Sequence, residues 1–185
     1  MSSGGPTGQA GSVELPDLDP RTRRLMLAEL ARDLEGRGAR LHSALLSARG
    51  RADWPELLRE ALGERDAAWL EEELLRHGRL SGVEPRAGEQ GGSSLVRATH
   101  PAAAAIAREF ERYYARAVCR RALDAGHGVV EVYPTTTART APGQVPTGRL
   151  MNARLVLTEL RWHPSDVRPP SGVPGPGIGV RLPRA

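Results

Sequence analysis

The chain has 185 residues, of which 39% are hydrophobic and only 4% aromatic, so any core is built mainly from leucine, valine and alanine. All 26 basic residues are arginine, against 22 acidic ones, and the absence of lysine excludes Schiff-base chemistry and the phosphate-binding loop that ends in Gly-Lys. The single cysteine excludes an internal disulfide and suits a reducing compartment.

Residues 1–16 are rich in Gly, Ser and Pro and predict a disordered tail. They contain neither a basic region nor an apolar run, and no apolar stretch in the chain reaches 18 residues. We therefore expect no signal peptide and no membrane partner. The expected location is the cytoplasm, or the inside of a particle assembled there.

Residues 17–80 predict a helical subdomain of three or four short helices. Asp19-Pro20 opens the first as N-cap and first-turn proline. Its apolar stripe is Leu27, Leu30, Ala31 and Leu34, which leaves Glu29 and Asp33 on the solvent side. Gly36 and Gly38 end or bend this helix.

Three more helical patterns follow in this subdomain. The first is closed by Gly50, and Asp53-Trp54-Pro55-Glu56 reads as a capping box that starts the next. The last covers 64–77 and ends at His77-Gly78. The apolar positions of the three patterns are Leu41, Ala44, Leu45 and Ala48; Leu57, Leu58, Ala61 and Leu62; and Ala67, Leu70 and Leu74.

Short helices separated by glycine also fit a helix-turn-helix that reads DNA. Residues 64–77 would be its recognition helix, but they carry five acids against two arginines. Phosphates would repel that surface, so we do not expect this half to read DNA.

Residues 81–98 predict a linker, and 99–185 form the second half of the chain. Its organising element is a long helix over Pro101–Ala125, with Thr99 or His100 as cap, Pro101 in the first turn and Gly126 after the last residue. Apolar residues recur at spacings of three and four along it: Ile106, Phe110, Tyr114, Ala117, Val118, Ala122 and Ala125.

The opposite side of this helix carries Arg108, Arg112, Arg116 and Arg120, each four residues from the last. Like charges at that spacing oppose the helix by roughly 0.2 to 0.5 kcal/mol per pair, which a packed helix absorbs. With Arg121 and Tyr113, which we expect to be exposed, the row forms a candidate interaction or anion-binding surface. Phe110 and Tyr114 are expected in the core.

The charge is unevenly distributed along the chain. Residues 1–80 have 12 arginines against 14 acids, whereas residues 97–121 have six against two. An acidic front and a basic back indicate an anionic partner, or subunits that meet head to tail.

The rest of the chain predicts a small sheet beside the long helix. Residues 128–133 form a strand in which Val130 and Val132 share one face, and Thr135–Thr137 extend it as an edge. Residues 150–162 fit a helix capped by Asn152, with Ala153, Val156, Leu157 and Leu160 inward, or a strand; helix is favoured. Residues 163–177 are extended, and 178–182 return as a strand beside 129–133. Strand, crossover helix and strand make a right-handed unit, so the fold class is α+β.

Candidate catalytic residues are few. The five histidines are dispersed and match no zinc spacing, so we expect no metal and no cofactor. Cys119, between Arg116 and Arg120, is the sole candidate nucleophile, and a small buried side chain is the favoured interpretation. Glu131 is the only acid in the predicted sheet, and Arg139 and Arg181 are its candidate ion-pair partners.

The stretch FERYYARAVCRRALD, followed by VVEVY and by PGPGIGVRL, resembles small proteins of actinobacterial phages and mobile elements over roughly residues 105–185. The resemblance contains no catalytic motif and implies a virion-associated or accessory protein. We expect a non-enzymatic structural or assembly protein that binds a protein partner or a second copy. The alternative is a nucleic-acid-binding protein that uses the arginine row.

Overall fold

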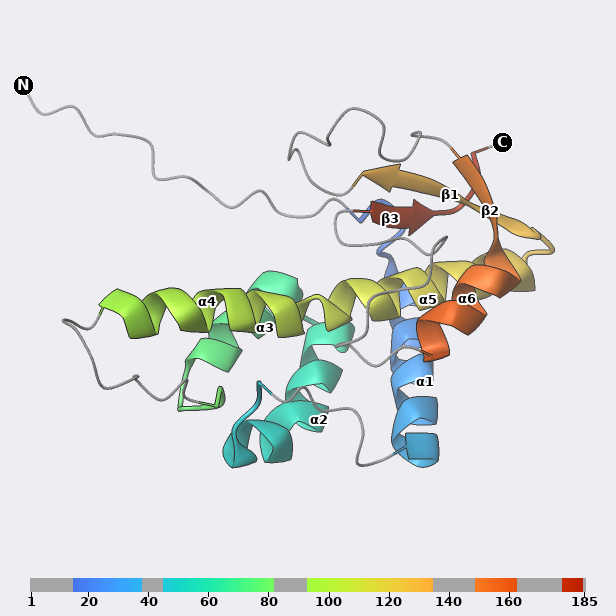
Figure 1. Ribbon diagram of the computed structural model, residues 1–185. Helices are drawn as coiled ribbons and strands as arrows, with labels where there is room; N and C mark the ends of the chain where they lie inside the picture. The colour runs from blue at the N-terminus through green and yellow to red at the C-terminus, as the bar shows by residue number, and fades with distance from the viewer. Residues whose placement is uncertain (1–14, 38–44, 82–92, 135–148, 163–177, 185) are drawn as a thin grey trace, which may run out of the picture.

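The computed structural model describes residues 15–37, 45–81, 93–134, 149–162 and 178–184 (Figure 1). Its elements run in the order α1 (Pro20–Arg37), α2 (Ala48–Gly63), α3 (Ala67–Leu75), α4 (Ser93–Ala107), α5 (Glu109–Asp124), β1 (Val129–Pro134), β2 (Arg149–Asn152), α6 (Ala153–Trp162) and β3 (Ile178–Arg181). Helices with one small antiparallel sheet confirm the α+β class.

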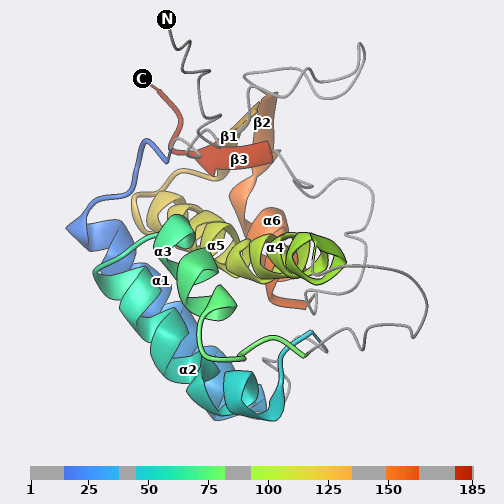
Figure 2. The same ribbon diagram turned by 90° about the vertical axis from the view of Figure 1, so that its left-hand side faces the viewer.

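Helix α5 is the centre of the molecule. The sheet covers one side of it, α1 and α2 cover the other, and α6 packs alongside (Figures 1 and 2). Phe110 and Tyr114 are buried as predicted. Residues 113–119 are buried on every side, so α5 has no solvent face at its middle. The predicted division into one apolar and one basic face is therefore wrong there.

The predicted long helix is two helices in near alignment (Figure 1). Helix α4 begins at Ser93, inside the stretch expected to be a linker, and ends at Ala107; α5 begins at Glu109. Pro101 therefore lies inside α4 instead of in a first turn. The packing of α3 against α4 offsets the backbone hydrogen bond that an internal proline removes.

Helix α1 starts as predicted, because the Asp19 carboxylate accepts a hydrogen bond from the Thr22 N–H at 2.8 Å. Helix α3 starts at a similar cap, from the Trp69 N–H to Asp66 at 2.8 Å. It buries Leu70 and Leu74 as expected. The chain then turns at His77 and Gly78, which both have positive φ.

The predicted break between two helices at residues 50–53 is wrong. Ser47 caps a single helix, α2, which runs through Gly50 and the supposed capping box and encloses Pro55. Trp54, Leu57 and Leu58 are buried along it, so tertiary packing outweighs the local start signal. Leu45 lies in a turn before α2, and residues 38–44 fall outside the described part.

The sheet has the strand order β2-β1-β3, and both neighbours run antiparallel to β1. The strands at 129–133 and 178–182 pair as predicted, but they run antiparallel. A right-handed strand–helix–strand unit requires parallel strands, so the prediction of such a unit is wrong. Val130, Val132 and Val180 are buried. Strand β2 includes residues 150–152, where the sequence favoured a helix and kept a strand as the alternative. The expected extensions at 135–137 and 163–177 lie outside the described residues.

Asn152 ends β2 and caps α6, since its side-chain oxygen accepts a hydrogen bond from the Leu155 N–H at 3.0 Å. This confirms the helical interpretation of residues 153–162, with Ala153, Val156 and Leu157 buried. None of the helices in the described part of the chain combines the length and apolar composition needed to cross a membrane.

Candidate functional site

Arg116, the centre of the predicted basic row, is 1% exposed and lies between α5 and α1. Its Nε and Nη2 donate to the Glu29 carboxylate at 3.2 and 2.8 Å, and Nη2 also donates to Asp33 at 3.0 Å. The Tyr113 hydroxyl donates to the same Asp33 carboxylate at 2.9 Å, and its ring lies 4.9 Å from the Arg116 guanidinium carbon. We call Glu29, Asp33, Tyr113 and Arg116 the buried ion cluster.

The buried ion cluster corrects three expectations. Arg116 and Tyr113, each 1% exposed, cannot belong to a surface that contacts a partner of the folded chain. Glu29, expected on the solvent side of α1, is also buried. A buried guanidinium needs hydrogen-bonded carboxylates to offset its loss of water, and two acids four residues apart on α1 supply them.

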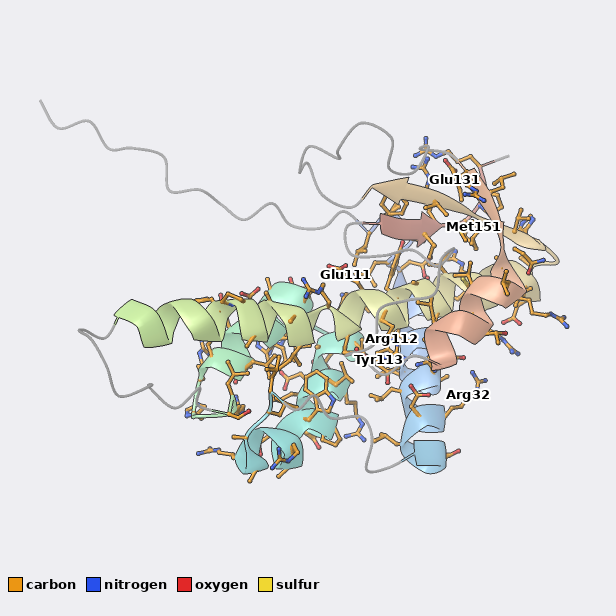
Figure 3. The ribbon with its side chains drawn as sticks, in the orientation of Figure 1. Arg32, Glu111, Arg112, Tyr113, Glu131 and Met151 are labelled. Atoms are coloured by element: carbon orange, nitrogen blue, oxygen red, sulfur yellow. The ribbon has the colours of Figure 1, made fainter. Side chains whose placement is uncertain are left out.

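Two further arginines of the candidate surface, Arg112 (labelled in Figure 3) and Arg121, form hydrogen bonds inside the chain. Arg112 donates to the Leu160 carbonyl from Nε at 2.9 Å and from Nη2 at 2.7 Å, and so caps the last turn of α6. Arg121 donates to Asp19, the N-cap of α1, at 2.6 Å and to the Thr22 hydroxyl at 3.0 Å. Both side chains hold a helix end against α5.

Only Arg108 and Arg120 of the predicted row reach the surface. Arg108 is exposed at the junction of α4 and α5 and makes no side-chain hydrogen bond to the described residues. Arg120 is 41% exposed and pairs with Asp124 one turn later at 3.0 Å. The structure therefore does not bring the six candidate residues together on one exposed face.

The uneven charge along the sequence is largely neutralised within one chain. Arg116 pairs with Glu29 and Asp33, and Arg121 pairs with Asp19 across about a hundred residues of sequence. The acidic partner that the basic helix requires is α1 and its cap. The charge asymmetry consequently gives no evidence for an external anion.

Burial and neighbouring charges shift the pKa values of two groups of the buried ion cluster, Asp33 and Tyr113, and of Glu109. Burial disfavours ionised Asp33, but the hydrogen bonds and charge of Arg116 outweigh it and hold its pKa below the ordinary value. Burial dominates at Glu109, whose pKa is raised despite its pairing with Arg112. Burial also raises the pKa of the Tyr113 hydroxyl, which therefore acts as a neutral donor.

Cys119 is fully buried in α5, as the favoured interpretation of the sequence had it. Burial and the nearby charge of Glu29 raise the pKa of its thiol to about 12. The neighbouring arginines do not lower it, because Arg116 faces its carboxylates and Arg120 faces Asp124. A protonated and inaccessible thiol is a poor nucleophile.

We expect Cys119 to resist a chromogenic disulfide reagent at pH about 8 for as long as the chain is folded. The same reagent should titrate the chain's one thiol promptly in denaturant. The check is the rate of absorbance change with and without denaturant. Equal rates would contradict the burial of this side chain.

Glu131 pairs with Arg181 on the neighbouring strand β3, one of the two partners predicted for it. Arg139, the other, lies outside the described residues. The hydrogen bond from Arg181 lowers the pKa of Glu131, and the Arg181 guanidinium carbon lies 5.5 Å from the Tyr133 ring. No cluster of three or more His, Cys, Asp or Glu side chains that could bind a metal occurs within the described ranges.

A different surface emerges where β2 meets α6. Leu150 and Leu155 are each 57% exposed, the largest exposed fractions among the large hydrophobic residues described. Arg149 and Arg154, which precede them, are exposed as well. We call these four residues the β2–α6 surface.

Sequence reasoning missed this surface because it treated residues 150–162 as one element. The signal was present, since a helix that buries Ala153, Val156 and Leu157 leaves Leu155 on its opposite side. Comparison of the chain with protein-family models, with curated proteins and with solved structures finds no match.

Proposed function

We propose that this chain is a non-enzymatic structural or assembly protein that binds a protein partner through the β2–α6 surface. The observation that carries the proposal is that Leu150 on β2 and Leu155 on α6, two consecutive elements, are each 57% exposed. Large apolar side chains that stay exposed beside charged ones are common at protein interaction sites.

The resemblance of residues 105–185 to proteins of actinobacterial phages and mobile elements supports a particle component as the setting. Nucleic-acid binding by the arginine row has less support. Arg116 is buried, and Arg112 and Arg121 are hydrogen-bonded within the chain. Phosphate contacts need guanidinium groups that reach solvent.

The proposal is tested by placing a photoreactive benzoylphenylalanine at position 150 or 155 of the full chain in its native cells. Irradiation should give a discrete protein adduct from each position. The matched control carries the same group at Glu56 on α2, whose side chain is 84% exposed, and should give none. Adducts to nucleic acid, or no protein adduct from either position, would overturn the proposal.

A further inference from the structure

Among the described strands, β2 pairs on one edge only, so its other edge is open to a further strand. It pairs with β1 from Val132↔Arg149 to Val129↔Asn152, and the strand order β2-β1-β3 places it outermost among the described strands. At the other side of the sheet, the N–H of Leu182 donates to Asp17 at 2.8 Å, so residues near α1 lie against the end of β3. The N–H and C=O groups on the side of β2 away from β1, which pair with none of the described strands, can accept another strand.

Strand β2 and helix α6 lie next to each other. Figure 2 shows β2 above α6, both on the side of the molecule away from α1. The Asn152 cap joins strand and helix without a loop, which fixes Leu155 relative to Leu150. A partner strand beside β2 would therefore lie close to the start of α6.

The two faces of the sheet at the β2 edge carry different side chains. Leu150 is paired with Glu131 and lies on the sheet face away from the helices. Arg149 is paired with the buried Val132 and so belongs to the helix-facing side, as does Arg154 on α6. A strand added here meets an apolar residue on one face and two arginines on the other.

The charge at this surface indicates which kind of segment can pair with β2. Neither the Arg149 nor the Arg154 side chain has a hydrogen bond or ion pair with a described residue, and Glu131 is already paired with Arg181. A second copy added through β2 would bring the same arginines together across the interface. The flanking segments 135–148 and 163–177 hold one acid, Asp166, against Arg139 and Arg168.

From these contacts we infer that β2 accepts an extended segment of a partner protein in which aliphatic and acidic side chains alternate. The aliphatic side chains contact Leu150, and the acidic ones face α6 and pair with Arg149 and Arg154. This inference rests on the proposed function and adds the chemistry of the partner.

The probe is a fluorescently labelled peptide of alternating valine and glutamate, about eight residues long, titrated into the full chain and followed by anisotropy. Binding should saturate, and a peptide with lysine in place of glutamate should bind about tenfold more weakly. Changing Arg149→Glu and Arg154→Glu together should reverse this preference. The matched control, Arg59→Glu with Arg76→Glu, changes one exposed arginine on α2 and one directly after α3 and should leave the affinities unchanged.

Strand addition makes a second prediction for the same probe. A peptide methylated at alternate backbone nitrogens loses the donors that pair with β2, so its binding should disappear. Among residues 149–152, the amides that point away from β1 should exchange fast in the free chain and be slowed by the glutamate peptide, whereas those that face β1 are protected in both states.

Three results would overturn the inference: no saturable binding of the glutamate peptide, equal binding of the lysine peptide, or slow exchange, in the free chain, of the β2 amides that point away from β1. If exchange is slow, the mass of the protein in solution shows whether a second copy or one of the chain's own segments occupies the edge of β2. If photocrosslinking yields a protein adduct while the peptides fail, the partner chemistry is wrong and the proposed function stands.

Discussion

Replacing Arg116 with methionine lowers the free energy of unfolding by about 3 to 5 kcal/mol, because Asp33 and Glu29 keep their positions and lose the buried guanidinium, and Glu29 keeps only its pair with the half-exposed Arg32 among the ion pairs described. Methionine retains the apolar stem, so little of the loss comes from packing. For a chain of this size the melting temperature should fall by roughly 6 to 20 °C. Urea denaturation of both proteins measures the difference.

Arg120→Met is the matched control, since Arg120 lies one turn further along α5 and its pair with Asp124 is substantially exposed. The free energy of unfolding should fall by about 0.5 kcal/mol or less. Equal losses for the two variants would show that Arg116 does not occupy a buried cluster.

The pH dependence of the free energy of unfolding gives an independent test of the role of Arg116. Because Arg116 lowers the pKa of Asp33, this carboxylate stabilises the fold above its unfolded pKa, and the contribution is lost as the pH falls through the folded pKa. Without the guanidinium the buried carboxylates favour the protonated form. The stability gap between wild type and Arg116→Met should therefore narrow from about pH 7 to about pH 4. A gap that stays constant would contradict this origin.

The buried ion cluster shows why the sequence predicted the elements better than the surface. A row of arginines at every fourth position has the same pattern whether it faces solvent or carboxylates from another helix. Its counterpart was visible in Glu29 and Asp33, also four residues apart, on a predicted helix of the acidic half. Pairing two rows about 85 residues apart needs tertiary information that periodicity does not contain.

Local signals succeeded where the decisive contacts are local. Asp19 and Asn152 were recognised as caps, because each accepts a hydrogen bond from an N–H three residues later. Local signals failed at Pro55 and Pro101. Both prolines lie inside helices, because packing stabilises the helix on both sides of the proline. The antiparallel direction of β3 also depends on where the chain travels between strands, which composition does not reveal.

Hydrogen bonds to backbone carbonyls join the start of α2 to the segment after α3. The N–H of Ser47 donates to the Arg79 carbonyl at 2.9 Å, and the Ser47 hydroxyl donates to the Gly78 carbonyl at 2.7 Å. The Ser81 N–H donates to the Leu45 carbonyl at 2.7 Å. Gly50 is buried against this hydrogen-bonded segment, and it fits there because it has no side chain.

Changing Gly50→Ala should lower the free energy of unfolding by about 3 kcal/mol, at the upper end of the range for overpacked sites. A Cβ at position 50 would lie 2.0 Å from the Arg79 carbonyl oxygen, a backbone atom that cannot rotate away. Arg79 is held further by its ion pairs with Asp53 and Glu73. Relief requires α2 to separate from residues 78–81, which breaks the Ser47 hydrogen bonds.

Gly63→Ala at the other end of α2 is the matched control, because its Cβ would meet only the Leu27 side chain at 3.8 Å, an ordinary contact. Alanine is the better helix former by about 1 kcal/mol in a helix interior, so at this last residue of α2 the change should be neutral or mildly stabilising. Urea denaturation midpoints of the two variants should therefore move apart, with Gly50→Ala well below wild type. A Gly50→Ala midpoint equal to that of wild type would mean that α2 and the Arg79 segment do not pack as closely as described.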